Sequence, residues 1–180
     1  MPEAEGVVLE IGMGSGENLP YYDPKRVKLV YGLEPSEGMR ALAEEKVERS
    51  GLLLEWLPFP GEAIPLEDNR VDTVLLTYTL CTIPDRSQAL REMKRVLKPG
   101  GRLLFCEHGL APDASVAKLQ RLINPLWSPL AGGCRIDLPM VDLILNAGFV
   151  IDELNSMYLP STPRPFGYNV WGKAFAKEAV

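Results

Sequence analysis

The chain has 180 residues, a net charge of −5 and 46% apolar residues, a size that suits one domain with a single buried core. No apolar run approaches the ~20 residues of a membrane-spanning helix, and no signal-peptide pattern precedes the first apolar stretch, so we expect a cytoplasmic protein without an integral membrane segment. Lysine and arginine are scattered and do not form a cluster, which argues against a nucleic-acid partner.

The most informative segment runs from residue 7 to residue 18 (VVLEIGMGSGEN), where an apolar strand leads directly into a glycine-rich turn. Gly12, Gly14 and Gly16 form this turn, and Glu10 precedes it. Glycine lets the backbone turn sharply and approach a ligand closely, which a Cβ would obstruct. A strand that enters such a turn predicts a nucleoside-binding crevice at the carboxyl ends of the strands of an open α/β sheet.

The acidic residues around the turn favour a positively charged nucleoside. The dinucleotide fingerprint G-x-G-x-x-G needs a glycine where this chain has Glu17, and a carboxylate there would repel a pyrophosphate. S-adenosylmethionine instead carries a sulfonium and an ammonium group, which suit the charges of Glu10 and Glu17. Glu34, which ends the next apolar stretch, is placed to bind both ribose hydroxyls. The sequence therefore predicts S-adenosylmethionine as the cofactor.

Farther along, apolar runs of strand length alternate with helical patterns, which predicts βαβ units and a parallel sheet. Ser36 is predicted to cap a helix that ends at Gly51, and Asp85 with Gln88 resembles a capping box. The other expected elements are a strand at 52–57, a helix that Pro99 and Gly100 stop, a strand at 102–107, a helix capped by Asp137 with Pro139 in its first turn and Gly148 as its stop, and two β-like stretches at 149–159 and 166–175.

Three further segments carry a family resemblance. Residues 61–66 (GEAIPL) look like a segment whose acid meets an adenine amino group, residues 69–76 (NRVDTVLL) like a fourth strand, and residues 90–101 like the helix and turn before a fifth strand. With the glycine turn, they make the chain resemble the class I S-adenosylmethionine-dependent methyltransferases over nearly its whole length.

The resemblance implies one α/β domain over residues 1–180, with a mostly parallel, Rossmann-like seven-stranded sheet, helices on both faces and an antiparallel last strand that the two late stretches complete. It implies S-adenosylhomocysteine as the product. The cofactor-binding residues that we predict are Glu10, Gly12, Gly14, Gly16, Asn18, Glu34, Pro35, Met39, Glu62, Ala63, Thr77 and Leu80.

Two regions depart from this pattern. The lid helices that family members usually place before the glycine strand are missing, so either the lid is dispensable or the chain is a shortened form. Residues 111–138 are inserted after the fifth strand and carry an apolar stripe broken by Pro125 and Pro129. The stripe fits core packing and an apolar cap over the substrate equally well. We predict the substrate cap.

Methyl transfer from a sulfonium is an in-line displacement, so positioning alone can supply much of the catalysis. His108, at the end of the fifth strand, is the candidate general base, and the alternative is a histidine that only shapes the pocket. Cys81 is expected to line the pocket as a small apolar group that faces the methyl group. Substrate contacts are predicted for Tyr21, Tyr22, Cys81, His108, Trp127 and Tyr168, with packing as the alternative role of the tyrosines.

Cys81, Cys106 and Cys134 are an odd number of cysteines without a C-x-x-C pair. With only one histidine in the chain, this pattern indicates reduced thiols. We therefore expect no disulfide framework and no metal site.

The methyl acceptor is the least determined feature. No Asn/Asp-Pro-Pro-Tyr segment follows the fourth strand, which disfavours DNA adenine and glutamine amides as acceptors. A resemblance to the group that includes alkyl thiol methyltransferases implies a small apolar acceptor (a thiol, a quinone or a lipid-like molecule) and rests on Leu80-Cys81, residues 105–108 (FCEH), Trp127 and Gly133-Cys134. Two alternatives remain: a non-catalytic S-adenosylmethionine-binding module, and a nicotinamide-dependent oxidoreductase, against which Glu17 speaks.

Overall fold

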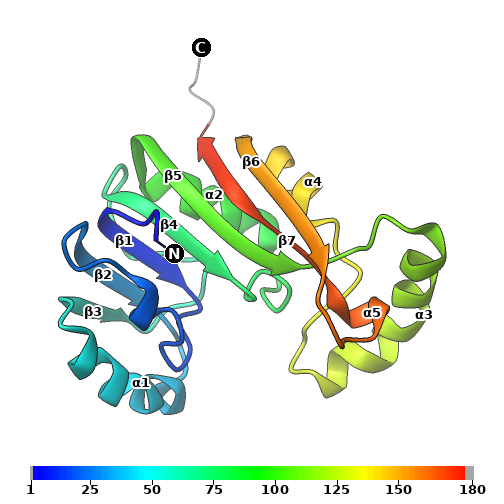
Figure 1. The fold of residues 1–180 in the computed structure, drawn as a ribbon. Helices are drawn as coiled ribbons and strands as arrows, with labels where there is room; N and C mark the ends of the chain where they lie inside the picture. The colour runs from blue at the N-terminus through cyan, green and yellow to red at the C-terminus, as the bar shows by residue number, and fades with distance from the viewer. Residues whose placement is uncertain (1, 177–180) are drawn as a thin grey trace.

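A computed structural model describes residues 2–176, and it shows one open, twisted sheet with helices packed against it (Figure 1). The strands are β1 (Gly6–Ile11), β2 (Val27–Leu33), β3 (Leu54–Leu57), β4 (Val71–Thr77), β5 (Leu97–His108), β6 (Phe149–Tyr158) and β7 (Tyr168–Ala176). The helices are η1 (Leu19–Tyr21, a single 3₁₀ turn), α1 (Glu37–Ser50), α2 (Arg86–Val96), α3 (Ala114–Leu130), α4 (Met140–Asn146) and α5 (Arg164–Gly167).

The strand order is β3-β2-β1-β4-β5-β7-β6. The pairs from β3 to β5 are parallel, whereas β7 is antiparallel to both β5 and β6. This is the predicted mostly parallel sheet with an antiparallel last strand. The chain order reverses between β1 and β4, and in open α/β sheets the ligand crevice lies outside the carboxyl ends of the strands at such a switch point.

Alternation along the strands builds a core on each face of the sheet. Leu9 and Ile11 of β1 belong to a buried cluster with residues of α2 and α4, whereas Val8 belongs to a cluster on the opposite face. Val47 of α1 packs against this second cluster. Side chains of successive strand residues point to opposite faces, so a continuous apolar strand requires cover on both.

The structure confirms two predicted helix ends and corrects two others. Ser36 accepts a hydrogen bond from the Met39 N–H, and Gly51 ends α1 in the left-handed conformation. Asp85 accepts from the Gln88 N–H, but the reciprocal half of the capping box is wrong, because Glu62 accepts the Asp85 N–H. The predicted cap by Asp137 is also wrong: its carboxylate pairs with Arg135, and α4 begins after Pro139 without a side-chain cap.

The inserted segment forms one continuous helix, α3, beyond the carboxyl end of β5 and beside α5 (Figure 1). Pro125 and Pro129 lie inside α3, so the predicted breaks are wrong. A proline inside a helix removes one backbone hydrogen bond and crowds the carbonyl four residues earlier, yet α3 continues to Leu130. The core reading is wrong for Leu122, Leu126 and Leu130, which are 74%, 76% and 88% exposed. The role of this segment as a substrate cap stays a prediction. Within residues 2–176, every helix is too short or too polar to cross a bilayer.

Replacing Ser36 with alanine is expected to lower the free energy of unfolding by about 0.5–2 kcal/mol, because the Met39 N–H loses its acceptor at the start of α1. Denaturant unfolding followed by circular dichroism measures this difference. Ser87→Ala is the control, since Ser87 is an exposed serine inside α2. Equal effects of the two substitutions would contradict a capping role for Ser36.

Candidate functional site

The glycine turn joins β1 to η1 at the switch point. Gly12, Gly14 and Gly16 have φ values of 63°, 56° and 75°, a left-handed conformation that favours glycine. The Gly12 and Met13 N–H groups donate to the Leu33 carbonyl at 2.9 and 3.2 Å, which ties the turn to the end of β2. The turn is therefore a rigid backbone surface between β1 and β2.

Glu34 follows β2 and closes one side of this surface. Its side chain is nearly buried, and its two carboxylate oxygens accept from the Gly14 N–H at 3.0 Å and from the Ser36 N–H at 2.9 Å. A carboxylate offers about four lone-pair sites, so acceptor capacity remains for two hydroxyl groups. These two backbone bonds fix the carboxylate at the edge of the crevice.

The predicted cofactor residues are divided between two cavities that share Gly12. One cavity, of about 240 Å³, has Glu34, Pro35 and Glu62 in its wall, together with Ile11, Gly12, Leu33, Pro60, Gly61, Thr79, Thr82, Ile83 and Pro84. The other, of about 410 Å³, lies along the glycine turn and is lined by Gly12, Met13, Gly14, Ser15, Glu17, Asn18, Tyr21, Met39, Thr77, Tyr78 and Cys106. We call these the Glu34 cavity and the Asn18 cavity.

Four predicted cofactor residues lie outside these walls, and one of them, Glu10, is described in the next paragraph. Leu80 is fully buried in the core, and its N–H donates to Glu107. Ala63 is exposed, and its N–H donates to the Pro60 carbonyl. Gly16 instead packs under the turn, where a Cβ would lie 2.8 Å from the Leu19 side chain. Leu80, Ala63 and Gly16 therefore line neither cavity.

A buried network supports the Asn18 cavity from below. Glu10 is 1% exposed and accepts from the Asn18 side-chain amide at 2.8 Å and from the Tyr22 hydroxyl at 2.6 Å. The same Asn18 amide donates to the Thr77 hydroxyl at 2.8 Å. Burial raises the pKa of Glu10 above its ordinary value, and hydrogen bonds from Tyr22 and Asn18 oppose that shift. Glu10 thus reaches the cavity only through Asn18.

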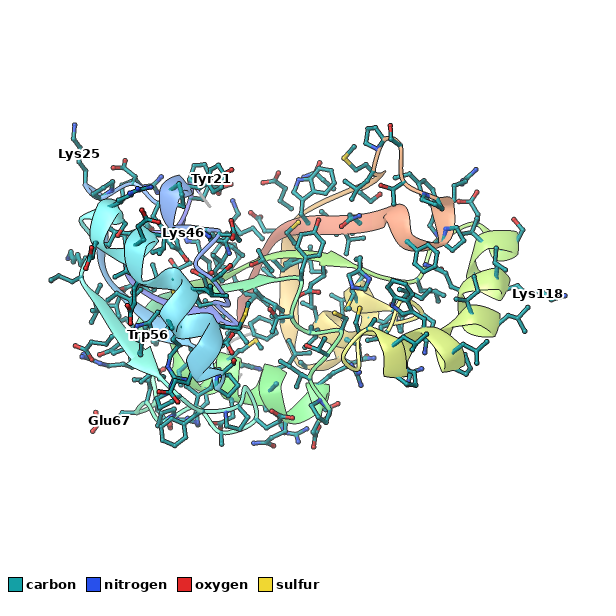
Figure 2. All side chains as sticks on the ribbon, turned by 90° about the horizontal axis from the view of Figure 1, so that it is seen from below. Tyr21, Lys25, Lys46, Trp56, Glu67 and Lys118 are labelled. Atoms are coloured by element: carbon teal, nitrogen blue, oxygen red, sulfur yellow. The ribbon has the colours of Figure 1, made fainter. Side chains whose placement is uncertain are left out.

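This network corrects the prediction for Tyr22. Its side chain is 5% exposed and its hydroxyl donates to Glu10, so Tyr22 has the packing role that was the alternative to a substrate contact. Tyr21, by contrast, is 64% exposed at the rim of the Asn18 cavity. Figure 2 shows Tyr21 and Lys46 on the α1 side of the molecule, whereas Lys118 projects from α3 on the other side.

The charge of Glu17 is balanced within the protein. Its carboxylate accepts hydrogen bonds from Lys46 and from the Ser15 hydroxyl, and these contacts lower the pKa of Glu17. Repulsion between Glu17 and a pyrophosphate is therefore weaker than the sequence alone predicts.

The pH dependence of stability provides a test of the Glu10 network. Because burial raises the folded-state pKa of Glu10, the folded protein holds this proton at pH values where the unfolded chain has lost it. Wild-type stability therefore falls as the pH rises from the ordinary value of 4.5 to the higher folded value. Glu10→Gln lacks this titration, so we expect it to gain stability relative to wild type over that window in denaturant unfolding. A difference between the two proteins that stays constant over that window would contradict the assignment.

The ends of β4 and β5 bring the acceptor-side residues together. Glu107 is buried, and its Oε1 accepts from the Thr79 N–H at 2.8 Å and from the Leu80 N–H at 3.0 Å. Burial raises the pKa of Glu107 to about 7 against these two bonds. The next residue, His108, stacks on Tyr78 with 6.2 Å between ring centroids, and burial lowers its pKa, which keeps the imidazole neutral.

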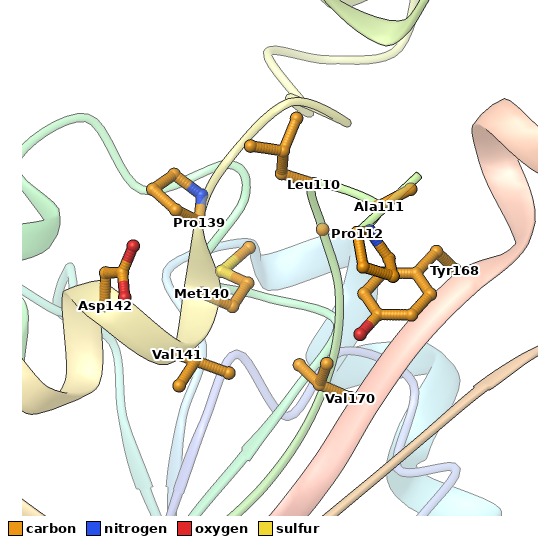
Figure 3. A pocket seen from close by; sticks show the side chains of 10 residues that line it. Leu110, Ala111, Pro112, Pro139, Met140, Val141, Asp142, Tyr168 and Val170 are labelled. Atoms are coloured by element: carbon orange, nitrogen blue, oxygen red, sulfur yellow. The ribbon is translucent and has the colours of Figure 1, made fainter. Parts of the chain in front are cut away.

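The predicted acceptor residues do not form one group. Cys81 is buried and lies outside the walls of both the Glu34 and the Asn18 cavity, whereas Cys106 lines the Asn18 cavity. Trp127 packs on Phe166 with ring centroids 4.7 Å apart. Tyr168 lines a third cavity, of about 230 Å³, between the segment after β5 and α4 (Figure 3).

Sequence reasoning missed Tyr78 and Cys106 as cavity residues. Both signals were available: Tyr78 directly follows β4, and Cys106 lies two residues before His108 and therefore on the same face of β5. Tyr78 also has a positive φ of 49°, which is uncommon for a residue with a side chain and occurs here at the cavity wall. Desolvation raises the pKa of Tyr78 to about 12, so its phenol is neutral.

Comparison with known proteins identifies the family. Residues 9–105 match the family described as "Methyltransferase domain". The chain is 33% identical over 175 residues to the thiol S-methyltransferase TMT1B of Rattus norvegicus, covering 94% of this chain and 70% of the relative. It is 40% identical over 108 residues to the ubiquinone/menaquinone biosynthesis C-methyltransferase UbiE of Geobacter sulfurreducens, covering 57% of this chain and 41% of the relative.

Solved structures of methyltransferases have the same fold. A solved structure of an S-adenosylmethionine-dependent methyltransferase from Methanosarcina mazei aligns with a TM-score of 0.73 at 21% identity and covers 98% of this chain and 94% of that one. The nicotinamide alternative is thereby left without support. The chain belongs to the class I S-adenosylmethionine-dependent methyltransferases, enzymes that use S-adenosylmethionine as the methyl donor.

Proposed function

We propose that this enzyme methylates the sulfur of a small apolar thiol. The observation that carries the proposal is the wall of the Asn18 cavity at the ends of β4 and β5, which is formed by Thr77, Tyr78 and Cys106. The nearby Glu107 carboxylate turns away from this wall, toward the Thr79 and Leu80 N–H groups. An acceptor here meets neutral side chains, which suits an apolar molecule that needs little help from a base.

We assign the cofactor to the two cavities in one orientation. We assign the ribose hydroxyls to Glu34 and the adenine to the Glu34 cavity beside Pro35 and Glu62. The methionine end then lies in the Asn18 cavity beside Gly14 and Asn18, with Thr77 and Met39 in the same wall. Glu10 and Gly16 support this site from beneath, and Ala63 and Leu80 contribute only through the backbone that carries them.

A thiol suits this chemistry because its ordinary pKa of ~8.5 already provides a few per cent of thiolate at neutral pH. The S–CH₃ bond forms as the bond between the methyl carbon and the sulfonium breaks, and the electron pair left on the cofactor's sulfur gives S-adenosylhomocysteine. We assign the role of proton acceptor for the thiol to His108, whose imidazole is neutral. The similarity to TMT1B, which is a thiol S-methyltransferase, supports this acceptor class. The free cysteines also suit the reducing cytoplasm, the location that we propose.

The test is product analysis by mass spectrometry after incubation with S-adenosylmethionine and one acceptor at a time: an alkyl thiol, a reduced quinone or phosphatidylethanolamine. We expect S-methylated thiol as the main product. The reduced quinone is included because the chain is similar to UbiE. Methylation of the quinone or the lipid alone would overturn the thiol proposal. Saturable cofactor binding with no product from any acceptor would indicate a non-catalytic binding module.

A further inference from the structure

Three side chains that typically bind soft metals converge although they come from distant parts of the sequence, and one of them, His108, stacks on Tyr78 of the Asn18 cavity wall. Cys81 follows β4, His108 ends β5, and Cys134 lies between α3 and α4. Their ligand atoms all lie within 4.8 Å of one another, and the Cys134 Sγ is 3.2 Å from the His108 Nε2. The expectation of no metal site was drawn from the spacing of the cysteines along the chain, which does not reveal that the fold brings these three side chains together.

The backbone holds Cys134 in this position. Gly132 and Gly133 turn the chain after α3 with φ values of 61° and 90°, and the Gly133 N–H donates to the Ser128 carbonyl at 2.8 Å. Arg135, the residue after Cys134, donates its N–H to the Cys81 carbonyl at 3.2 Å. This bond connects the two segments that carry the cysteines. Cys134 therefore faces Cys81 because its loop is anchored at both ends.

The same loop is anchored from inside the protein. Asn124 of α3 is buried, and its side-chain oxygen accepts the Ile136 N–H at 3.1 Å. The Arg86 guanidinium donates to the Cys81 carbonyl at 3.1 Å from the other side. The bonds from Arg86 and Arg135 to the Cys81 carbonyl thus fix the backbone that carries this cysteine.

The spacing and the donor types fit zinc. Zn²⁺ binds cysteine sulfur at ~2.3 Å and histidine nitrogen at ~2.0–2.1 Å in tetrahedral geometry, which separates neighbouring donor atoms by about 3.5–3.8 Å. The Cys134 Sγ lies 3.2 Å from the His108 Nε2, and no two of the three ligand atoms are more than 4.8 Å apart, so side-chain rotations can bring all three onto one ion. Two thiolates and a neutral imidazole would also balance the ion's charge.

Three protein ligands would leave one position of a tetrahedral zinc ion open. Among residues 2–176, the cluster contains three donors and no fourth cysteine, histidine or carboxylate. Three protein ligands with an open fourth position characterise zinc sites that bind a reactant, whereas structural zinc sites are closed by four. Cys81 is buried, but His108 and Cys134 are partly exposed, which leaves the open position accessible.

We propose that Cys81, His108 and Cys134 bind Zn²⁺ and that the open position takes the sulfur of the acceptor thiol. The second half of this inference rests on the proposed function. On coordination the acceptor releases its S–H proton to solvent, and the zinc-bound sulfur then attacks the methyl carbon while the sulfonium bond breaks. Because a coordinated thiol is deprotonated outright, the ion takes over the role of base, and His108 becomes a ligand.

The ion site is tested without any methylation assay. Reduced, chelator-treated protein is titrated with ZnCl₂ by calorimetry and, separately, with CoCl₂ by absorption spectroscopy. We expect about one equivalent of either ion per chain and a thiolate-to-cobalt charge-transfer band. Cys134→Ser should weaken zinc binding by more than about 100-fold, since loss of a mere outer-shell partner typically costs ~10–100-fold. Cys106→Ser is the matched control, because Cys106 lies near the site but outside the cluster, and it should retain the ion.

Each result bears on the proposal. Absence of binding by the reduced wild type, or equal loss in both serine variants, would overturn the zinc site. A disulfide between Cys81 and Cys134 would also overturn the zinc site if the protein still did not bind zinc after that bond had been reduced. Circular dichroism of both variants shows whether a loss reflects misfolding, and His108→Ala provides a second variant if Cys134→Ser does not fold.

The acceptor half is tested by comparing thiol methylation before and after metal removal. We expect at least about a 10-fold loss of kcat/KM for the thiol with unchanged S-adenosylmethionine affinity, and recovery on adding ZnCl₂. Equal methylation with and without zinc would leave the thiol function standing and overturn the role of the ion. Zinc binding without methylation of any thiol would leave the ion site standing and overturn the proposed function.

Discussion

Replacing Gly12 with alanine is expected to cause the largest loss of cofactor binding of any single methyl-sized change in the glycine turn. Gly12 has a φ of 63°, which costs an alanine roughly 1–2 kcal/mol. An added Cβ would also lie 2.4 Å from the Thr79 Cγ2, so the turn or the segment after β4 must move. Overpacking of this kind typically costs ~1–3 kcal/mol. Because Gly12 lines both cavities, the shift deforms the whole cofactor site.

We expect Gly12→Ala to lower the free energy of unfolding by about 2–5 kcal/mol and to abolish saturable S-adenosylmethionine binding in calorimetry. Gly51→Ala is the matched control: Gly51 has a φ of 66°, but nothing lies within 4 Å of its added Cβ. That control carries the backbone strain without the clash and should bind the cofactor normally. Normal binding by Gly12→Ala would show that the turn is not part of the cofactor site.

Replacing Glu34 with alanine is expected to weaken S-adenosylmethionine binding by about 1–3 kcal/mol, or roughly 5- to 150-fold in Kd. Two effects contribute: the ribose hydroxyls lose a charged acceptor, and the Gly14 N–H loses the oxygen that orients the glycine turn. Calorimetry with S-adenosylmethionine measures the change directly.

A second ligand separates these two effects. Methylthioadenosine keeps the ribose but lacks the amino acid end of the cofactor, so it should lose as much affinity as S-adenosylmethionine if the ribose contact dominates. A much smaller loss for methylthioadenosine would mean that Glu34 acts mainly through Gly14 and the turn. Unchanged affinity for both ligands would rule out the ribose role.

Features encoded by neighbouring residues were predictable from the sequence. The strand before Gly12, the acid that ends β2 and the serine cap of α1 all depend on residues within a few positions of one another. Backbone sterics and hydrogen bonding act at that range, so their outcome can be derived without knowing the rest of the fold. The sheet with its antiparallel last strand followed from the same local patterns together with the family resemblance.

Features that depend on contacts between distant residues required the tertiary structure. Tyr22 was expected at the substrate, yet its hydroxyl finds the buried Glu10 carboxylate, since a buried carboxylate needs hydrogen-bond donors. Asp137 was expected to cap α4, but an ion pair with Arg135 competes for its carboxylate. In both cases a nearer or stronger partner decided the outcome.

The cysteine cluster shows this division most clearly. Cys81 and Cys134 are 53 positions apart, and their spacing resembles no metal-binding motif. The parallel order of β4 and β5 places the residues after their carboxyl ends side by side, and the loop anchored by Asn124 adds Cys134 from a third segment. The local pattern of residues was therefore sufficient to predict the cofactor, because strand, turn and acid adjoin in the chain. The meeting of two thiols and an imidazole was decided by the tertiary fold, because only the packing of three separate segments brings their side chains within reach of one another.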